Sequence, residues 1–268
     1  MNLSLFFTGF HKSDNAALVF RTALRYSGSI MKVLIIIPCY NEQDTIHELC
    51  REVRGKTTHD LLVINDGSTD NSRNILRREA IPHLDLSLNL GIGGAVQTGY
   101  RYALRNGYDI AVQLDGDGQH DPEWIESLVA PLKNDKADLV IGSRFISGAG
   151  FQSSATRRLG IRFFKALIFC LTGRKITDAT SGFRAVNRKT MFLFNNFYPK
   201  DYPEPESTTL ALRNELRVCE VPVEMRARKG GVSSISGVTS VYYMFKVSVG
   251  IIISLVKPKI KFPTQEVS

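Results

Sequence analysis

Short apolar runs alternate with longer segments of helical periodicity between Lys32 and Gly142. The runs read VLIIIP, LLVIND, LDLSLN, DIAVQLD and ADLVIG, and helical periods fill 42–54, 70–80, 91–106 and 122–133 between them. Continuous Val, Ile and Leu runs separated by helices are typical of buried parallel strands. We therefore expect an α/β protein with a mostly parallel, Rossmann-like sheet flanked by helices, and ligands at the carboxyl ends of its strands.

Carboxylates gather at one of these strand ends. The stretch QLDGDGQHDPEW places Asp115, Asp117 and Asp121 within seven positions, directly after the apolar run DIAV. A calcium EF-hand loop fits poorly, because its sixth position should be Gly and is His120, and because a strand precedes it. A phosphatase nucleophile motif would need Thr or Val in place of Gln119. A third pattern, the DxD metal motif of glycosyltransferases, remains.

The three carboxylates divide into two groups. Asp121 is followed by Pro122 and Glu123 and then by a helical period, so we expect it to be the N-cap of the next helix. Asp115 and Asp117 are left as a pair at the end of a strand. Two carboxylates alone would repel a diphosphate, so such a pair suits a divalent cation that neutralises the leaving group.

Positive charge is concentrated in the second half of the chain. The net charge is +8, and seven Lys or Arg but no Asp or Glu lie between Leu139 and Thr177. Such a field attracts nucleic acid, anionic lipid or phosphorylated substrates. The four cysteines form no CxxC pair, so neither a zinc site nor a disulfide framework is expected, and a reducing cytosol fits.

Four strand-end segments together resemble the nucleotide-binding segments of family 2 glycosyltransferases. IPCYNEQDTI, VINDGSTDNS, NLGIGGAVQTGY and QLDGDGQHDP match that family in order and approximate spacing. The resemblance implies a GT-A fold. It also implies a nucleoside pocket in which Asp66 accepts hydrogen bonds from the base, lined by Pro38, Tyr40, Glu42, Asp66 and, near the ribose and phosphate, Asp115.

The resemblance further implies Mg²⁺ or Mn²⁺ as cofactor, with Asp115, Asp117 and Gln119 as ligands. The sequence departs from the family at Asn65, where a second Asp is frequent, and we expect nucleotide binding to survive this change. GIGGA lacks the Gly that a dinucleotide fingerprint needs at Val96. It is either a tight turn that opens a helix or a direct phosphate contact.

Three later motifs look like the polyprenyl-phosphate branch of the family, which includes dolichol-phosphate mannose synthases and bacterial undecaprenyl-phosphate sugar transferases. They are GSRF (142–145), DATSGFRAVNR (178–188) and EVPVEMRARKGGVSS (220–234), which extends the resemblance over 31–235. It implies that phosphate is held by Arg144, Ser181, Arg184 and Arg228, and that the catalytic residues are Asp117, Arg144 and Arg184. For any single arginine, a solvated surface role is the alternative.

This branch implies inverting transfer of a sugar from a nucleotide donor to a polyprenyl phosphate for cell-surface glycan synthesis. A lipid monophosphate has a second pKa of about 6, so its oxygen can attack without a general base. We favour a uridine diphosphate sugar over guanosine diphosphate mannose, and expect no nucleic-acid partner. One alternative is transfer to a glycan hydroxyl, with Glu206 in the loop YPEPES as general base. Another is a non-catalytic subunit that binds nucleotide sugar.

The two ends of the chain carry separate expectations. We interpret 1–30 as an extension of uncertain role and 236–268 as a membrane-associating or oligomerising helix and tail. A helix is expected at about 238–256, in which Lys246, Gly250 and Ser254 form a narrow stripe. The helix could lie at a membrane interface, pack this stripe on a partner helix, or belong to the core or to an oligomer interface.

The segment 157–171 predicts a basic amphipathic helix. Arg158, Arg162 and Lys165 share one face, and an apolar line follows another, formed by Leu159, Phe163, Leu167 and Leu171. Such a helix could lie on an anionic membrane or pack on the catalytic domain. We expect a peripheral protein at the cytoplasmic membrane face, docked on itself or on a small membrane protein. His47, His59, His83 and His120 are expected to be surface or loop residues.

Overall fold

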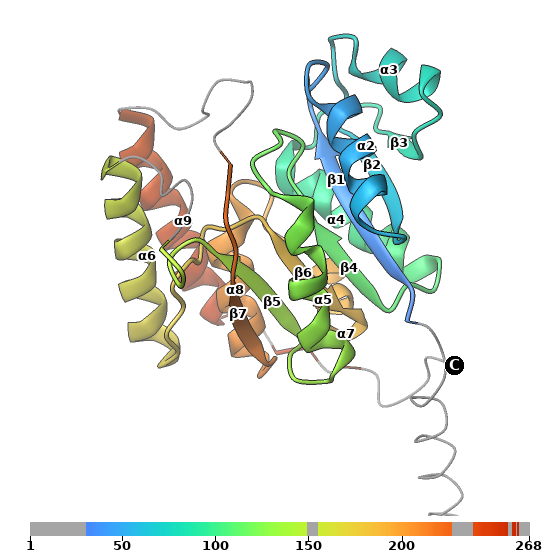
Figure 1. The fold of residues 1–268 in the computed structure, drawn as a ribbon. Coiled ribbons are helices and arrows are strands. Elements are labelled where there is room, and N and C mark those ends of the chain that lie inside the picture. Colours follow the sequence, from blue (N-terminus) through green and yellow to red (C-terminus); the bar gives the residue numbers. More distant parts are fainter. Residues whose placement is uncertain (1–30, 149–154, 227–237, 257–258, 261, 263–268) are drawn as a thin grey trace, which may run out of the picture. The chain divides into compact units, whose positions relative to one another are not determined.

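The computed structural model describes residues 31–148, 155–226, 238–256, 259–260 and 262, and these contain a seven-stranded sheet. The strands are β1 (Val33–Cys39), β2 (Asp60–Asn65), β3 (His83–Asp85), β4 (Ile110–Gln113), β5 (Leu139–Ser143), β6 (Arg184–Asn187) and β7 (Val218–Pro222). Their order is β3-β2-β1-β4-β6-β5-β7 (Figure 1). Among them β6 runs antiparallel to β4 and β5, and the other pairings are parallel. The predicted mostly parallel α/β sheet is confirmed.

Strand β1 lies inside the sheet because it has no polar residue to expose. All seven of its residues are buried, and Ile36 pairs with Leu62 of β2 on one side and with Gln113 of β4 on the other. A Cβ atom at Gly99 would come within 2.4 Å of the Ile36 side chain. The glycine therefore lets its helix, α4 (Gly91–Arg105), approach β1 closely. Pairing with β2 and β4 sets the carboxyl end of β1 beside the ends of these two strands.

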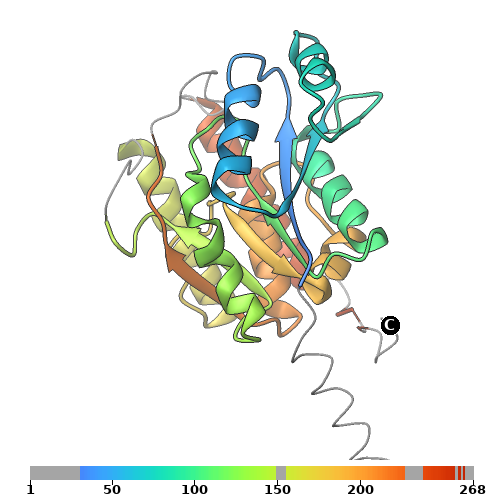
Figure 2. The same ribbon diagram turned by 45° about the vertical axis from the view of Figure 1, so that its right-hand side comes forward.

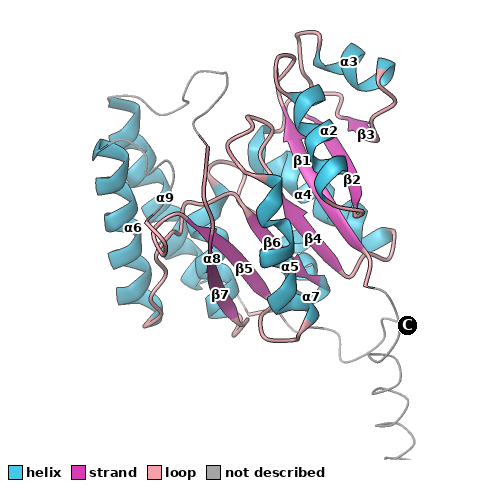
Figure 3. Cartoon of the chain, in the orientation of Figure 1, coloured by secondary structure: helices cyan, strands magenta, loops and turns pink. Residues whose placement is uncertain are grey.

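Helices cover both faces of the sheet (Figures 1, 2 and 3). Their bounds are α2 (Ile46–Lys56), α3 (Ser72–Arg78), α4 (Gly91–Arg105), the 3₁₀ turn η1 (Pro122–Trp124), α5 (Ile125–Lys133), α6 (Ala155–Thr172), α7 (Arg188–Asn196), α8 (Pro203–Arg213) and α9 (Val238–Val256). Helices α4, α7 and α8 lie on one face and α2 and α5 on the other, while α6 and α9 pack outside α8. The largest described core cluster joins α4, α7 and α8 to the strands.

The motif DATSGFRAVNR (178–188) contains β6, and the segment YPEPES, which the sequence predicts as a loop, begins α8. Pro203 and Pro205 are tolerated because the first turn of a helix has no carbonyl partner for their missing N–H groups. The expectation that Glu206 lies in a loop is therefore wrong, because it occupies the first turn of α8.

Helix α9 occurs at the predicted residues, but its narrow stripe faces this chain. Lys246 Nζ lies 2.7 Å from Asp201 Oδ2, a Cβ atom at Gly250 would come within 2.5 Å of Glu206 Oε2, and Ser254 is fully buried. The interpretation that the stripe packs on a partner helix is therefore wrong. Val247 and Ile251 instead join Phe164 of α6 in a second small core cluster.

The outward side of α9 is apolar. Its exposed large side chains are Phe245, Val249, Ile252, Ile253 and Val256. Of the helices within the described ranges, none combines the length and the hydropathy that crossing a membrane requires.

The predicted faces of α6 are only partly as expected. Leu167 and Leu171 pack toward the cluster with α9, but Phe163 is exposed, and the residues that enter the core are Ile161, Phe164 and Ile168. The side chain of Leu159 and the extension 1–30 lie outside the described residues.

Candidate active site

The ends of β1, β2 and β4 meet at one edge of the sheet. Pro38 is buried near the end of β1, Glu42 is half-buried in the following turn, and Tyr40 between them is 47% exposed. The Thr45 hydroxyl lies 3.0 Å from Glu42 Oε2 and 2.9 Å from the carbonyl oxygen of Gly116. The structure therefore brings the predicted nucleoside-pocket residues of β1 next to the loop that follows β4.

Asp66 follows β2 and is almost completely buried. Its Oδ1 accepts a hydrogen bond of 2.7 Å from the backbone N–H of Leu90, and the N–H of Gly91 also donates to the carboxylate. Burial raises the pKa of Asp66 above its ordinary value, and the two N–H donors only partly oppose this. The carboxylate is thus an oriented acceptor at the sheet edge.

The buried side chain of Asn65 both donates and accepts hydrogen bonds, which an amide can do and a carboxylate cannot. The side chain is fully buried; its Nδ2 donates to Asp85 Oδ1 at 2.7 Å, and its Oδ1 accepts from the N–H of Ser68. An ionised Asp could accept but not donate, and it would face the Asp85 carboxylate. Asn65 therefore joins the turn after β2 to the end of β3, and Asp66 next to it remains available.

The loop after β4 carries the two predicted metal carboxylates. The Asp115 side chain is about one-third exposed, and its Oδ1 accepts from Gln113 Nε2 at 3.2 Å. Asp117 is buried, and its Oδ1 accepts from the N–H of Gln119 at 3.0 Å. Gly118, between Asp117 and Gln119, has φ +72°, a left-handed conformation that turns the chain there.

A second turn lies directly against Asp115. A Cβ atom on Gly182 would come within 2.6 Å of Asp115 Oδ2. The motif SGFR therefore needs glycine at this place because the backbone itself contacts the carboxylate.

The described residues contain no group of three or more His, Cys, Asp or Glu that could by itself hold a metal ion. Asp115 and Asp117 are nevertheless the oxygen donors that Mg²⁺ and Mn²⁺ prefer. Such sites in enzymes commonly use one or two carboxylates completed by substrate phosphates and water. The donor set fits a cation shared with a diphosphate.

Asp121 caps the next helical segment. Its Oδ1 accepts a hydrogen bond of 3.0 Å from the N–H of Glu123, and Pro122 begins η1. The predicted N-cap is confirmed. Asp121 Oδ2 also lies 2.7 Å from Arg226 Nη2.

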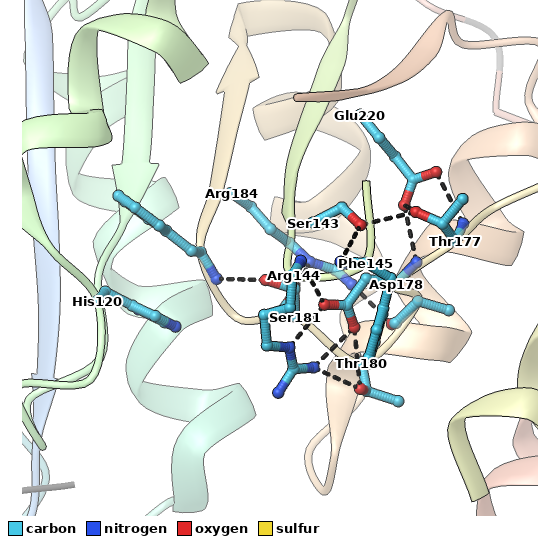
Figure 4. Close-up of polar contacts among 12 residues, drawn as sticks. His120, Ser143, Arg144, Phe145, Thr177, Asp178, Thr180, Ser181, Arg184 and Glu220 are labelled. Carbon is cyan, nitrogen blue, oxygen red and sulfur yellow. Dashed lines mark hydrogen bonds and ion pairs between the residues drawn. The ribbon is translucent and has the colours of Figure 1, made fainter. Parts of the chain in front are cut away.

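Arg144 is bound to a carboxylate of this chain. Its Nε and Nη2 donate to the two oxygens of Asp178, both at 2.7 Å, and Nη2 also donates to Thr180 (Figure 4). Asp178 is fully buried and Arg144 is 5% exposed. Sequence reasoning missed Asp178, although DATSGFR contains it, because its partner is distant in the chain.

A second carboxylate organises the same turn. Glu220 of β7 accepts hydrogen bonds from the backbone N–H groups of Thr177 and Asp178 and from the Thr177 hydroxyl (Figure 4). Glu220 of β7 therefore holds the turn in which Asp178 faces Arg144.

Arg184, the second arginine predicted as a phosphate contact, is also bound to groups of this chain. It is fully buried, and its guanidinium donates to the carbonyl oxygens of Ala179, Ser181 and Glu204 and to the Ser207 hydroxyl. Ser181 is 1% exposed, and its hydroxyl accepts from the N–H of Phe183. A phosphate could reach Arg184 only by displacing these contacts, so here Arg184 joins the 179–183 turn to the start of α8.

Exposed cations lie elsewhere, on α6. Arg158, Arg162 and Lys165 line one pocket of about 350 Å³, which is completed by Phe145, Ile161 and Thr177. Phe145 and Thr177 directly neighbour Arg144 and Asp178 in the chain. The predicted basic face of α6 is therefore confirmed. It supplies the cationic residues of the pocket, and the other lining residues are apolar or carry a hydroxyl group.

Three further sequence predictions concern GIGGA, Arg228 and His120. GIGGA opens α4, as one of the two alternatives predicted, and the N–H of Gly93 donates to the carbonyl oxygen of Lys200. Arg228 lies outside the described residues. His120 lies in the loop after β4, as predicted, but it is 3% exposed and contacts Asp115, so it is not a surface residue.

Known proteins resemble the chain in sequence and fold. The family model described as Glycosyl transferase family 2 matches residues 34–192. The chain is 30% identical to the UDP-N-acetylglucosamine--dolichyl-phosphate N-acetylglucosaminyltransferase of Methanococcus voltae, over 72% of this chain and 84% of that protein. It is 32% identical to the undecaprenyl-phosphate mannosyltransferase of Micrococcus luteus, over 77% of this chain and 88% of that protein.

A solved structure shares the fold. Glucosyl-3-phosphoglycerate synthase from Mycobacterium tuberculosis, in complex with Mn²⁺, UDP-glucose and phosphoglyceric acid, superposes with a TM-score of 0.65 at 18% identity. The match covers 84% of this chain and 79% of that one. It confirms the predicted GT-A fold.

Proposed function

Because the chain belongs to glycosyl transferase family 2, we propose that it transfers a sugar from a nucleoside diphosphate donor to a polyprenyl phosphate, with inversion at the anomeric carbon. The names of its relatives support this acceptor class, because both contain a polyprenyl-type phosphate. The observation that carries the proposal is the pocket on α6.

That pocket has the chemistry of a lipid phosphate. Arg158, Arg162 and Lys165 provide charge for the phosphate oxygens, and guanidinium groups bind such oxygens in pairs. Phe145 and Ile161 supply apolar surface for the first isoprenoid carbons. A sugar hydroxyl would not require three cations.

The nucleophile then needs no general base. A phosphate monoester is largely ionised near neutral pH, so its oxygen can displace the nucleoside diphosphate in one in-line step. Transfer to a glycan hydroxyl would need a carboxylate base, and Glu206 was the candidate. Its carboxylate lies against Gly250 of α9, which favours a packing role over a base.

The donor binds at the strand ends in this proposal. Asp66 accepts from the nucleobase, with Pro38, Tyr40 and Glu42 lining the nucleoside pocket, while Asp115 and Asp117 face the diphosphate. Mg²⁺ or Mn²⁺, held by Asp115, Asp117 and Gln119, would supply positive charge for the departing diphosphate. Arg144 and Arg184 act in this scheme by fixing the turn beside Asp115, since their guanidinium groups are bound to Asp178 and to carbonyls.

We also propose that the protein acts at the membrane surface, on the cytoplasmic side. Phe163 and Phe169 are exposed on α6, the helix that carries the cationic pocket residues, and α6 contacts α9, whose outward side is also apolar. Apolar side chains bordered by Lys and Arg are the usual composition of an interfacial helix. Such docking would bring the pocket to the headgroup region, where the phosphate of the lipid lies.

The test is direct transfer. The purified chain is incubated with undecaprenyl phosphate, Mn²⁺ and a panel of UDP-N-acetylglucosamine, UDP-glucose and GDP-mannose, and the glycolipid is followed by mass spectrometry. We expect one donor to give a glycosylated lipid phosphate and Asp117→Asn to abolish it. Product on a soluble glycan but not on the lipid would contradict the proposed acceptor.

A further inference from the structure

The His120 side chain links the two ends of the loop that follows β4, residues 114–121, which we call the metal loop. The loop leaves β4, passes through Asp115 and Asp117, and returns at His120, whose Nδ1 lies 3.0 Å from the backbone nitrogen of Asp115. Since the N–H of Asp115 donates to Nδ1, the proton of the neutral ring is on Nε2. Nε2 lies 3.7 Å from Asp115 Oδ2, so both ring nitrogens face the same residue.

The ring is held in place by its surroundings. It is 3% exposed and stacks on Phe183, with ring centroids 4.8 Å apart and planes 10° apart. Phe183 follows Gly182, whose backbone contacts the Asp115 carboxylate. His120 and the 182–183 turn therefore flank Asp115; Figure 4 places His120 away from the Arg144–Asp178 pair.

The backbone on the far side of His120 is also anchored. His120 forms an isolated antiparallel bridge with Met225, and the N–H of Arg226 donates to the carbonyl oxygen of Gln119 at 2.9 Å. The Arg226 guanidinium pairs with Glu52 of α2 and with Asp121. The end of the loop is fixed by α2 and the segment after β7, and the His120 side chain transmits that position to Asp115.

We infer that His120 is a positioning residue that sets Asp115, and through it the arrangement of the metal carboxylates toward the donor diphosphate. The inference rests on the proposed function. His120 contacts neither donor nor acceptor in this role. Groups that orient metal ligands typically change metal affinity or activity by 10-fold to 100-fold when replaced.

Three substitutions separate the hydrogen bond from packing. His120→Phe keeps a ring on Phe183 and removes the acceptor. His120→Asn places an amide oxygen near the position of Nδ1, whereas His120→Gln places it near that of Nε2. His47→Asn, at an exposed position on α2, controls for removal of a histidine.

The measurement is Mn²⁺ binding with UDP as the probe nucleotide, followed by the electron paramagnetic resonance signal of free Mn²⁺. We expect His120→Phe and His120→Gln to weaken Mn²⁺ binding by about 10-fold to 100-fold, and His120→Asn to recover most of it. UDP binding without metal should change less than twofold in every variant. The control should behave as the unchanged protein.

Two results would overturn the inference while leaving the proposed function intact. One is Mn²⁺ binding by His120→Phe equal to that of the unchanged protein. The other is an equal loss in His120→Asn and His120→Gln, accompanied by equal falls in melting temperature, which is the pattern of a packing role. No Mn²⁺ binding by the unchanged chain with UDP or GDP, together with no transfer, would contradict both proposals.

Discussion

Two sets of basic residues lie close to the segment 177–184 or within it, and they are used in opposite ways. Arg144 and Arg184, which the motifs single out, are buried and donate to partners within the chain. Arg158, Arg162 and Lys165 belong to a plain amphipathic helix, yet they are exposed and line a pocket. A motif position therefore marks where the fold needs a residue, while availability to a ligand depends on what else binds that residue.

The cost of burial explains the difference. A buried guanidinium is tolerated only if its donors are satisfied, and once satisfied it has little left for a ligand. An exposed cation keeps its donors for a phosphate. The first set should govern stability and the second should govern activity on the lipid.

Removing the partner of Arg144 should have the largest effect. Asp178→Ala leaves a buried charge without its carboxylate, and breaking such a pair costs about 3–5 kcal/mol. Urea unfolding followed by circular dichroism measures this loss. Glu123→Ala, which removes an exposed partner of Lys56, is the control and should cost under about 1 kcal/mol. Similar small losses in both would mean that the buried pair does not hold the turn.

Arg184→Met should follow, with a loss of about 3 kcal/mol. The variant leaves the carbonyls of Ala179, Ser181 and Glu204 without a donor, while removal of the buried charge offsets part of that cost. The same unfolding experiment applies, with transfer measured on the fraction that remains folded. If Arg184→Met kept full stability and lost only lipid-phosphate affinity, Arg184 would belong with the pocket cations.

Neutralising the α6 cations should leave stability unchanged within about 0.5 kcal/mol. Arg158→Gln, Arg162→Gln and Lys165→Gln should each lower kcat/KM for the lipid phosphate about 10-fold to 100-fold, because a hydrogen bond to a charged group is worth about 1.5–3 kcal/mol. The assay is initial rates over a range of undecaprenyl phosphate. Arg105→Gln, exposed at the end of α4, removes the same charge elsewhere. An equal fall in that control would reduce the effect to general attraction for anionic lipid.

The smallest expected effect is the pH dependence of stability from two carboxylates, Asp66 after β2 and Asp85 at the end of β3, whose pKa values are shifted in opposite directions. Burial raises the pKa of Asp66, so its charged form costs stability at neutral pH, and that cost fades as pH falls through its folded-state pKa. The pKa of Asp85 is lowered, since hydrogen bonds from Asn65 and Arg77 outweigh its burial. Asp85 therefore stabilises the fold above its ordinary pKa and loses that contribution as pH falls through its folded-state pKa.

Thermal unfolding at several pH values tests both signs. At neutral pH we expect Asp66→Asn to raise the melting temperature and Asp85→Asn to lower it. Both differences should shrink in acid. Shifts of the same sign for the two variants would contradict the assigned causes.

Much of the fold follows from local pattern. Four apolar runs predicted β1, β2, β4 and β5, because a strand buried on both faces must be apolar along its length. The run LDLSLN predicted β3, whose residues are partly buried or exposed, and helix 238–256 was predicted with the observed bounds. Strand β6 and helices α7 and α8 were not predicted. β6 has four residues and begins with a buried arginine, and α8 begins with two prolines, so neither shows its period.

The sequence by itself determined strands β1 to β5, the carboxylates that follow them and the Asp121 cap, since each depends on neighbours within a few residues. It could not determine which arginines are free, that His120 is buried against Asp115, or that the stripe on α9 faces α8. Those properties depend on partners such as Asp178, Phe183 and Asp201, which are tens of residues away. Whether a charged or polar group binds a ligand or supports the fold is decided by which of its hydrogen-bonding atoms the tertiary structure has already used.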